Sequence, residues 1–309
     1  MVKFIWNRLI VSIPVILGSL TLVFLIIHWL PGDPAQMIAG DDAAPERIAY
    51  LRQQFGLDRP LWQQYALYLW DSVRGDFGHS FANSQPVIDR LLAQLPATLS
   101  LALMSTIFAI IVGFLLGVLS AVYQNRVLDY IVRVVSLLGV SMPKFWLGIL
   151  LILVFSVHFQ WLPAIGNGSF KQLILPSFAL GVTGAGMLTR MVRNSVLDVI
   201  NEPFVLTLRA KGLTEKIVLY KHVLRNALLP AVTILGLLVG EMLSGAVVTE
   251  TVFSRQGLGK LVVDAINQKD IPVIQAAILI TGVFNILVNL MVDVSYSYVD
   301  PRVRKTGSS

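Results

Sequence analysis

The chain has 309 residues, of which 55% are apolar and only 14% are charged. Soluble globular proteins typically contain about 45–50% apolar and about 25% charged residues, so this composition excludes an ordinary soluble domain and indicates a polytopic membrane protein. The formal net charge is +6, and there is no cysteine, which excludes disulfides, thiolate metal sites and cysteine nucleophiles.

The first apolar segment, residues 9–30, follows the basic residues Lys3 and Arg8. It has about the 20 residues that are needed to cross hydrocarbon, and it exceeds the about 7–15 apolar residues of a signal peptide. We therefore expect a retained first membrane span.

Five further apolar segments predict a six-helix, all-α membrane protein with a single transmembrane domain over residues 1–309, whose spans two to six occupy 97–295. The expected spans are 97–123, 131–157, 172–193, 227–248 and 271–295. Pro143 interrupts the third, and Gly181, Gly184 and Gly186 weaken the pattern of the fourth. Such breaks are tolerated where neighbouring helices satisfy the freed backbone groups.

The distribution of Lys and Arg predicts that both termini lie in the cytoplasm. The two short loops on the extracytoplasmic side hold only Lys171, Arg255, Lys260 and Lys269. The long extracytoplasmic loop, residues 31–96, carries little weight, because the rule applies to short loops. The inner segments hold Lys3, Arg8, Arg126, Arg133, Arg190, Arg193, Arg209, Lys211, Lys216, Lys221, Arg225, Arg302, Arg304 and Lys305. Because this rule already explains the basic residues, and no basic stripe with interleaved aromatics occurs, no nucleic-acid partner is expected.

The long outer loop, residues 31–96, has the composition of a small folded cap. Within it, apolar residues at 61, 65, 68 and 69 fit one face of a helix. A purely structural cap and a docking surface remain equally open interpretations, and residues 249–270 form a second outer loop.

The inner loop, residues 199–226, contains a short basic segment, 201–213, with helix signals at both ends. Asn201 can cap the first free N–H groups, Pro203 suits the first turn, and Gly212 can end the helix in a left-handed conformation. A capped basic helix between two spans is typical of a docking element.

Sequence motifs for catalysis are missing. Residues 254–261 come nearest to a phosphate-binding loop but lack its first glycine and its hydroxyl, and neither His-Glu-x-x-His nor Gly-x-Ser-x-Gly occurs. The four histidines, at 28, 79, 158 and 222, are too far apart in sequence to suggest a metal site. No enzyme, bound cofactor or metal is expected in this chain.

Ionisable residues inside spans are costly and are functional candidates. Lys144, Glu241 and Asp293 qualify. Lys144 is expected to face Glu241 or a water-filled path. A structural ion pair and a lining of the translocation path both stay open for Lys144 and Glu241. Ser141 and Met142, beside Pro143, are further candidates for lining the path.

Two further pairs lie on the expected spans. Asn285 and Asn289 share a helix face and can line a path or bond between helices. Gly113 and Gly117 form a small-x3-small pattern that close helix packing explains.

An ordered set of motifs runs through nearly the whole chain. It consists of Pro31-Gly32-Asp33-Pro34-Ala35, Phe55-Gly56-Leu57-Asp58-Arg59-Pro60-Leu61, Gly75-Asp76-Phe77-Gly78-His79-Ser80, Pro96-Ala97-Thr98-Leu99, Gly139-Val140-Ser141-Met142-Pro143, Gln160-Trp161-Leu162-Pro163, Arg209-Ala210-Lys211-Gly212-Leu213, His222-Val223-Leu224-Arg225-Asn226-Ala227-Leu228-Leu229-Pro230, Asp270-Ile271-Pro272-Val273 and Asp300-Pro301-Arg302. With these motifs the chain resembles the permease subunits of bacterial ATP-binding-cassette (ABC) importers of the dipeptide, oligopeptide and nickel group.

The resemblance implies the type I importer permease fold in the bacterial inner membrane. It implies that the segment Leu208, Arg209, Ala210, Lys211, Gly212 and Leu213 is the coupling helix that contacts an ATPase subunit. It also implies a second homologous permease, two ATPase subunits that hold ATP and Mg²⁺, and a solute-binding protein that meets the 31–96 cap and the 249–270 loop. Small peptides would cross by alternating access, past Ser141, Met142, Lys144, Glu241, Asn285 and Asn289.

Three departures from the family pattern stand out. Leu206-Thr207-Leu208 replaces the Glu-Ala-Ala opening of the wider superfamily, Gln256 replaces a proline of the outer motif, and Lys144 replaces a small or neutral residue. A lone cation at 144 would favour an anionic cargo.

Alternative interpretations concern the cargo first. Nickel or another chelated metal, glutathione or an opine would suit the same family. A channel or secondary transporter that works alone is a second class, and a membrane enzyme is a third, for which no catalytic constellation exists.

Overall fold

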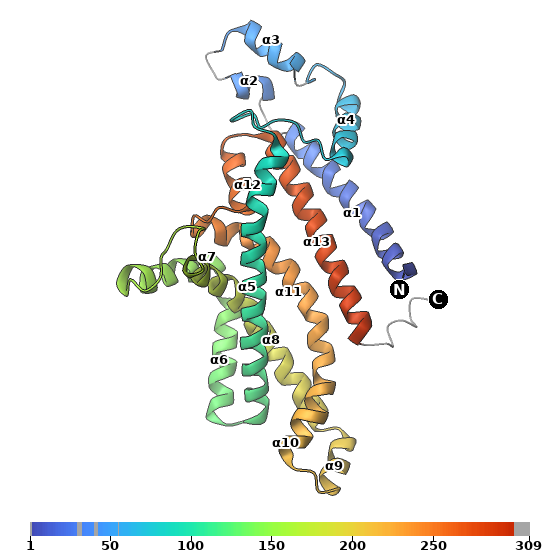
Figure 1. Cartoon of the computed structure of the whole chain (residues 1–309), viewed down its shortest axis with the longest axis vertical. Helices are drawn as coiled ribbons and strands as arrows, with labels where there is room; N and C mark the ends of the chain where they lie inside the picture. Colours follow the sequence, from blue (N-terminus) through green and yellow to red (C-terminus); the bar gives the residue numbers. More distant parts are fainter. Residues whose placement is uncertain (1, 30–32, 40–42, 55, 300–309) are drawn as a thin grey trace. The chain divides into compact units, whose positions relative to one another are not determined.

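The structure is a computed structural model that describes residues 2–29, 33–39, 43–54 and 56–299, with side chains at most of these positions. Every regular element within these ranges is a helix (Figure 1). The helices are α1 (Val2–Trp29), α2 (Pro34–Ala39), α3 (Pro45–Gln54), α4 (Leu61–Arg74), α5 (Val87–Val122), α6 (Val127–Ser141), α7 (Lys144–Leu151), α8 (Lys171–Ile200), α9 (Pro203–Ala210), α10 (Glu215–Ile217), α11 (Leu224–Val252), α12 (Leu258–Asn267) and α13 (Ile271–Val299), with π-helical segments at Ile152–His158 and Val218–Val223. The predicted all-α class is confirmed.

Three helices in the described ranges are long and apolar enough to cross a membrane: Val87–Val122, Lys171–Ile200 and Ile271–Met291. The bent pair of α6 and α7–His158 makes a fourth if it counts as one span. The first and fifth predicted spans coincide with α1, whose apolar stretch is Ile10–Ile26, and with α11. The number of six spans therefore stays a prediction.

The chain divides into two compact units. Unit 1 comprises residues 1–5, 97–256 and 287–309, and unit 2 comprises residues 6–96 and 257–286. Because α1, α5 and α13 each contribute to both units, the division does not define two independent segments of sequence.

In unit 1, α8 packs against α6 and α11. Gly113 and Gly117 let α5 approach α8 closely, because a Cβ atom at these positions would lie 2.8 Å from the Cβ of Leu188 and 2.7 Å from that of Val192. The predicted role of this glycine pair in helix packing is confirmed. The largest buried apolar cluster of the unit joins α5, α8, α9 and α11.

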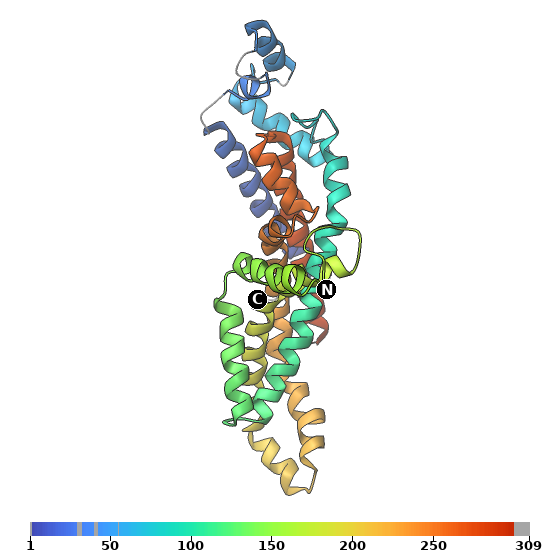
Figure 2. The ribbon, with the colours of Figure 1, turned by 90° about the vertical axis from the view of Figure 1, so that its left-hand side faces the viewer.

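The third predicted span, 131–157, is not one straight helix. α6 ends at Ser141, α7 begins at Lys144, and the two are bent by 107° (Figure 2). Proline lacks an N–H group and disfavours helical geometry in the residue before it, and Met142 is accordingly extended (φ −76°, ψ 131°). Pro143 therefore turns the chain sideways, where a continuous span was expected.

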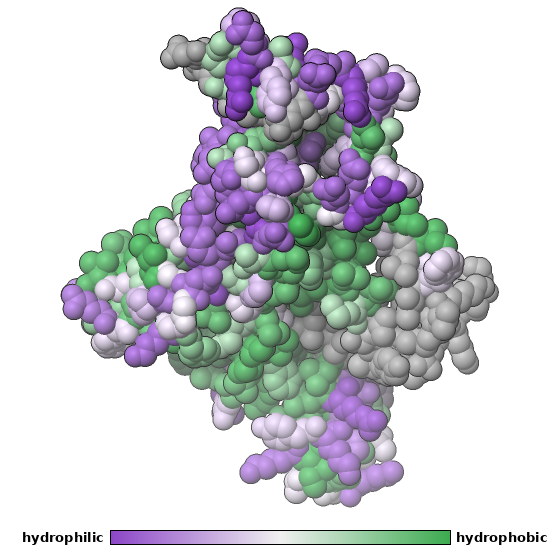
Figure 3. All heavy atoms as spheres, turned by 45° about the horizontal axis from the view of Figure 1, so that its top comes forward, coloured by the Kyte–Doolittle hydropathy of each residue, from purple (hydrophilic) through white to green (hydrophobic). Residues whose placement is uncertain are grey.

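Much of the visible surface is hydrophobic (Figure 3). On α6, large apolar side chains are exposed over the whole length of the helix, for example Val127, Ile131, Val135 and Leu138. A soluble monomer rarely exposes such contiguous apolar area, whereas lipid or a neighbouring membrane subunit covers it.

Unit 2 contains the cap helices α2, α3 and α4, most of α1, α12, and the first parts of α5 and α13. The predicted helical cap is confirmed as an element of structure. Tyr65 and Tyr68 of α4 pack against Phe24 of α1, with ring centroids 5.2 and 5.9 Å apart. Leu61, expected on the same inward face, is exposed at the first position of α4.

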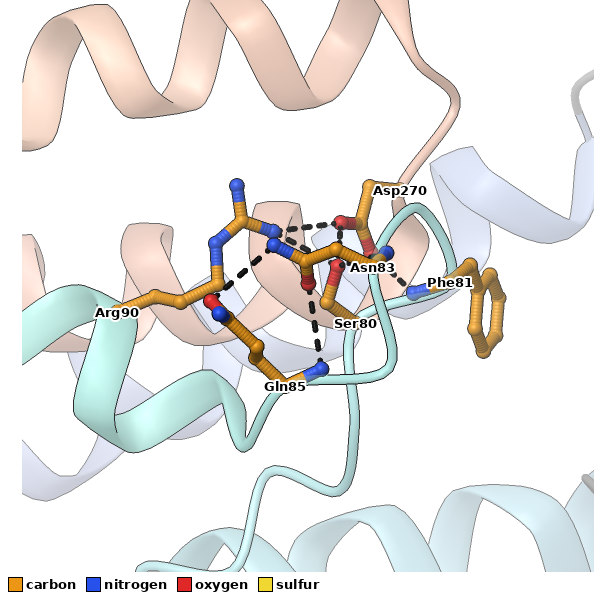
Figure 4. A network of polar contacts seen from close by, with 6 residues as sticks. All are labelled: Ser80, Phe81, Asn83, Gln85, Arg90 and Asp270. Atoms are coloured by element: carbon orange, nitrogen blue, oxygen red, sulfur yellow. Dashed lines mark hydrogen bonds and ion pairs between the residues drawn. The ribbon is translucent and has the colours of Figure 1, made fainter.

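A second finding is that the segment 249–270 is largely helical, since α11 extends to Val252 and α12 occupies Leu258–Asn267. The loop before α5 is tied to the residue before α13 (Figure 4). The buried carboxylate of Asp270 accepts hydrogen bonds from Ser80 Oγ at 2.5 Å, from the backbone N–H of Phe81 at 2.9 Å and from Arg90 Nη1 at 3.0 Å. Three donors thus compensate a charge that has no access to water.

Candidate functional site: helix α9 and the Lys144–Glu241 pair

Helix α9 begins as the sequence suggests, with one correction. Pro203 is its first residue, and the preceding Glu202 is extended (φ −68°, ψ 144°). Asn201 does not cap α9. Its amide Nδ2 donates to the carbonyl of Leu197, 2.8 Å away, because Asn201 is the C-cap residue of α8. Two residues, Asn201 and Glu202, separate the two helices, so α9 is attached to α8 by a short hinge.

The other end of α9 is closed by Gly212. This glycine has φ +79°, its N–H donates to the carbonyl of Arg209 at 2.9 Å, and the N–H of Leu213 donates to the carbonyl of Leu208 at 3.4 Å. This pair of bonds is the Schellman motif, in which a left-handed residue stops a helix and satisfies its last carbonyls. The predicted glycine stop is confirmed.

The inner face of α9 is anchored in the core of unit 1. Val205 is fully buried, and Leu208 and Leu213 pack half-buried against the same apolar cluster. The cluster includes Val196 of α8 and Val223 at the end of a π-helical segment. Apolar burial on one side fixes the orientation of such a short helix, which would not be stable alone.

The six residues predicted to contact an ATPase therefore divide by position. Arg209, Ala210, Lys211 and Gly212 are exposed, whereas Leu208 and Leu213 face inward and hold the helix in place. The exposed members keep their predicted contact role, and the two leucines fit a supporting one.

Sequence reasoning missed an apolar surface beside these residues. Leu206 is 70% exposed and Tyr220 is 66% exposed, and Phe204 and Ile217 are exposed as well. Exposed apolar clusters with a polar rim mark interaction sites. The signal was present at Leu206, an apolar residue that stands in a water-exposed basic segment.

An ion pair connects α9 to α10. Arg209 donates from Nε and Nη2 to the two carboxylate oxygens of Glu215, at 2.7 and 3.1 Å. These hydrogen bonds lower the pKa of Glu215 and raise the pKa of Arg209. Arg209 thus has a partner in its own chain, which sequence spacing did not reveal.

A buried ion pair secures the end of α8 from which α9 extends. Arg193 donates from Nε and Nη2 to Asp129 at 2.8 and 2.9 Å, and Ser120 Oγ and the N–H of Asn125 donate to the same carboxylate. The hydrogen bonds from Arg193, followed by those from Ser120 and Asn125, hold the pKa of Asp129 well below its usual range. The turn between α5 and α6 is thereby locked to α8.

Lys144 and Glu241 form the ion pair that the sequence suggested. Lys144 Nζ lies 2.8 Å from Glu241 Oε1, with side chains 21% and 38% exposed. Ser141, in the last turn of α6, is exposed, and Met142, at the bend, is half-buried. Pro143 places the first residue of α7 beside α11, so the bend itself creates the pair.

The remaining candidates are placed as follows. Asn285 and Asn289 lie four residues apart on α13, the former half-buried with no hydrogen-bond partner for Oδ1, the latter exposed. The side chain of Asp293 lies outside the described residues. In the ranges that the structure describes, no group of three or more His, Cys, Asp or Glu residues is arranged to hold a metal ion.

Two family models match this chain. Residues 110–305 match the binding-protein-dependent transport system inner membrane component, and residues 1–102 match the N-terminal part of that component. The chain belongs to this family, which makes it a permease subunit of an ABC importer and a multi-pass protein of the inner membrane. The predictions of family, of permease function and of a non-enzymatic role are confirmed.

Curated relatives match over almost the full length. A dipeptide transport system permease protein, DppB, of Alkalihalophilus pseudofirmus is 40% identical and covers 98% of this chain and 100% of its own length. A glutathione transport system permease protein, GsiC, of Escherichia coli strain K12 is 44% identical and covers 98% of this chain and 99% of its own.

Among solved structures, an inward-facing conformation of the methionine ABC transporter MetNI matches 70% of this chain and 99% of its own, with a TM-score of 0.59 and 21% identity. This similarity confirms the fold of an importer permease.

Proposed function

We propose that this chain forms half of a translocation path for small peptides and that α9 couples the path to an ATPase subunit. The observation that carries the proposal is the construction of α9. It is a short rod with a closed end, anchored on one face by Val205 and open on the other through Leu206, Arg209 and Lys211. A rod so fixed passes a displacement to the helices on which it is anchored.

The cargo assignment rests on the relatives. A dipeptide permease and a glutathione permease both match over 98% of the chain. Dipeptides and glutathione are both small and both carry free ammonium and carboxylate groups, so we propose a peptide of this size and charge type. Identity of 44% to the glutathione permease makes glutathione the second candidate cargo.

The partners proposed for the complete system are a second homologous permease, two ATPase subunits that bind ATP and Mg²⁺, and an extracytoplasmic solute-binding protein. The basic residues at inner loop ends support cytoplasmic termini and a cytoplasmic α9. The cap helices of residues 31–96 and the segment 249–270 are then extracytoplasmic, where a binding protein would meet them.

Coupling is tested by a charge on the open face of α9. We expect Leu206→Asp to abolish ATP-dependent import and to release the ATPase subunits during purification, because a carboxylate on an apolar contact surface must be desolvated. Tyr50→Asp, on the exposed surface of cap helix α3, is the matched control and should keep the ATPase subunits bound. Retention of ATPase subunits and of import in Leu206→Asp would overturn the role of α9.

Sidedness is tested with single cysteines, since the chain has none of its own. A membrane-impermeant thiol reagent added outside intact cells should modify Tyr50→Cys and leave Gly212→Cys unmodified until the membrane is opened. The opposite labelling pattern would place α9 outside and would contradict coupling to a cytoplasmic ATPase.

A further inference from the structure

The side of α11 that carries Glu241 is open and polar, although α11 belongs to an apolar protein. Ser244, Val248 and Thr251 follow Glu241 at spacings that keep them on one helix face, and these three are exposed. The opposite side of α11 is buried and mostly apolar, with Leu238, Met242, Leu243 and Ala246, and near its end it also buries Thr249 and Glu250. A half-exposed carboxylate and an exposed hydroxyl within a span are unsuited to lipid, so we infer that this face borders a water-filled space in the assembled transporter.

Lys144 is seated on this face by a glycine. A Cβ atom at Gly245 would lie 2.9 Å from Lys144 Nζ and 3.6 Å from its Cδ, so any side chain there would displace the ammonium group. Gly245 is one helical turn beyond Glu241, and the lysine stem therefore runs along α11 to reach the carboxylate. Pro143 and Gly245 together build the pair from two distant parts of the sequence.

The pair is closed on one side only. Glu241 is 38% exposed and Lys144 is 21% exposed, and within the described residues only Oε1 of the carboxylate accepts a hydrogen bond from the lysine. By contrast, both carboxylate oxygens of Asp129 are bonded, and that side chain is fully buried. The Lys144–Glu241 pair can therefore form further hydrogen bonds on the exposed face of α11.

We propose that Lys144 and Glu241 are a cargo site that binds the two charged ends of a small peptide. This inference rests on the proposed function and names the chemistry by which the path holds its cargo. Lys144 takes the peptide carboxylate, and Glu241 takes the peptide ammonium group. Because the pair is solvent-accessible, it is weakly held and can open, and a zwitterion then gives each group a new charged partner at once.

The geometry limits the length of the cargo. Two extended residues span about 7 Å, and the flexible four-carbon stem of lysine can follow the carboxylate over such a distance. A longer peptide would place its ends too far apart to engage both groups. Because Glu241 neutralises Lys144, the site as a whole favours a zwitterion over the anion that Lys144 alone would suggest.

The test uses a cysteine reporter in the complete transporter, held in lipid nanodiscs. Ser244→Cys introduces the single thiol of this chain on the open face of α11, and the rate of its modification by a small thiol reagent is measured with and without peptide. The probes are Ala-Ala, N-acetyl-Ala-Ala and Ala-Ala-amide, added directly, so that no binding protein selects among them. Measurements are made without nucleotide and with a non-hydrolysable ATP analogue.

We expect Ala-Ala to slow the modification, and each capped peptide to need about tenfold more for equal protection, as loss of one charged hydrogen bond predicts. In Glu241→Gln the acetyl cap should no longer matter, and in Lys144→Met the amide cap should no longer matter. This crossed pattern requires that each peptide end meets its own partner.

Several outcomes would overturn the proposal. These are equal protection by free and capped peptides, cap effects that do not cross between the two variants, or a Ser244→Cys thiol that stays unmodified in both nucleotide states. The double variant Lys144→Met/Glu241→Gln leaves no single charge unpaired and controls for misfolding, and Val127→Cys on α6 is the reporter that peptides should not protect.

Failure of this inference is distinguishable from failure of the proposed function. If the parent complex imports Ala-Ala with ATP while free and capped peptides protect the thiol equally, only the cargo site at Lys144 and Glu241 is wrong. If the parent complex with its binding protein imports no small peptide, the cargo assignment itself is wrong.

Discussion

Among the described residues of unit 1, two ion pairs join distant parts of the chain, and their surroundings differ. Asp129 is fully buried and accepts from Arg193, Ser120 and the backbone of Asn125. Glu241 is 38% exposed and receives one bond from Lys144. Both carboxylate oxygens of Asp129 accept hydrogen bonds from within the protein, whereas the carboxylate of Glu241 is partly open to solvent.

This difference separates a structural pair from one that is available to a ligand. A buried charge whose partners are all fixed cannot exchange them without a large desolvation cost. An ion pair that is partly exposed, as Lys144–Glu241 is, is only weakly held, because solvent screens it. The comparison predicts that mutations at the first pair reduce stability and that mutations at the second change transport.

The largest effect is expected from removal of Asp129. Asp129→Ala leaves Arg193 buried without its carboxylate, and breaking a buried pair in this way costs about 3–5 kcal/mol. We expect poor assembly and a lower unfolding temperature of the purified chain. Arg193→Met/Asp129→Leu removes both charges and should recover much of the loss. A single Asp129→Ala chain as stable as the parent would show that the pair holds nothing together.

Asp270 in unit 2 extends the comparison to a second closed carboxylate. Its three donors include the fixed N–H of Phe81, so Asp270→Ala leaves that N–H without its acceptor and Arg90 without its carboxylate partner. An unsatisfied buried group costs about 1–3 kcal/mol. We expect faster proteolysis within residues 78–86, measured by limited digestion and mass spectrometry. An unchanged rate of digestion there would show that Asp270, unlike Asp129, does not stabilise its surroundings.

The pH dependence of stability sharpens the same contrast. Because the pKa of Asp129 is lowered in the folded chain, the carboxylate contributes stability above the pKa of about 3.9 that Asp has in unfolded chains. That contribution is lost as the pH falls from about 4 toward the folded-state pKa. The difference in unfolding temperature between the parent and Asp129→Asn should therefore shrink between pH 5 and pH 3, about the range in which Asp titrates.

A difference that stays constant over this range would contradict the assignment of the pKa shift to the ion pair with Arg193. Lys144→Met/Glu241→Gln measured beside it shows how much of the acid effect belongs to the rest of the chain.

The open pair should respond in the opposite way. Lys144→Met/Glu241→Gln is expected to change stability by less than about 1 kcal/mol, as for solvent-accessible pairs, and yet to lower import of small zwitterionic peptides. Thermal unfolding and ATP-dependent uptake in proteoliposomes measure the two effects on one preparation. A large loss of stability with normal uptake per folded complex would show that Lys144–Glu241 is a structural ion pair, like Asp129–Arg193.

Much of the fold could be predicted because its signals are local. Apolar segments long enough to span a membrane, Pro203 at a helix start and Gly212 at a helix end each depend on neighbouring residues only. The bend at Pro143 was visible as an interruption, but its angle of 107° depends on how α7 packs against α8 and α11. Packing between distant segments is not written in local sequence.

The same boundary runs through the candidate site. Lys144 and Glu241 could be paired from sequence, because a charge inside a span needs a partner. The ion pair of Asp129 and Arg193 could not be predicted from sequence, since both residues lie at span ends, where charged residues are common. Asn201 was assigned to the wrong helix because an asparagine at a junction can bond either way, and only the contact to Leu197 decides.

The smallest effect is expected at the ion pair between α9 and α10. Glu215→Gln removes the partner of Arg209 on the surface, where such pairs contribute little to stability, so the unfolding temperature should stay at the parental value. The freed guanidinium gains mobility at the open face of α9, and we expect a modest decrease in the coupling ratio of peptide imported per ATP hydrolysed. Lys216→Gln, the neighbouring exposed residue, is the matched control. A coupling ratio that falls equally in both variants would mean that the Arg209–Glu215 contact has no part in positioning α9.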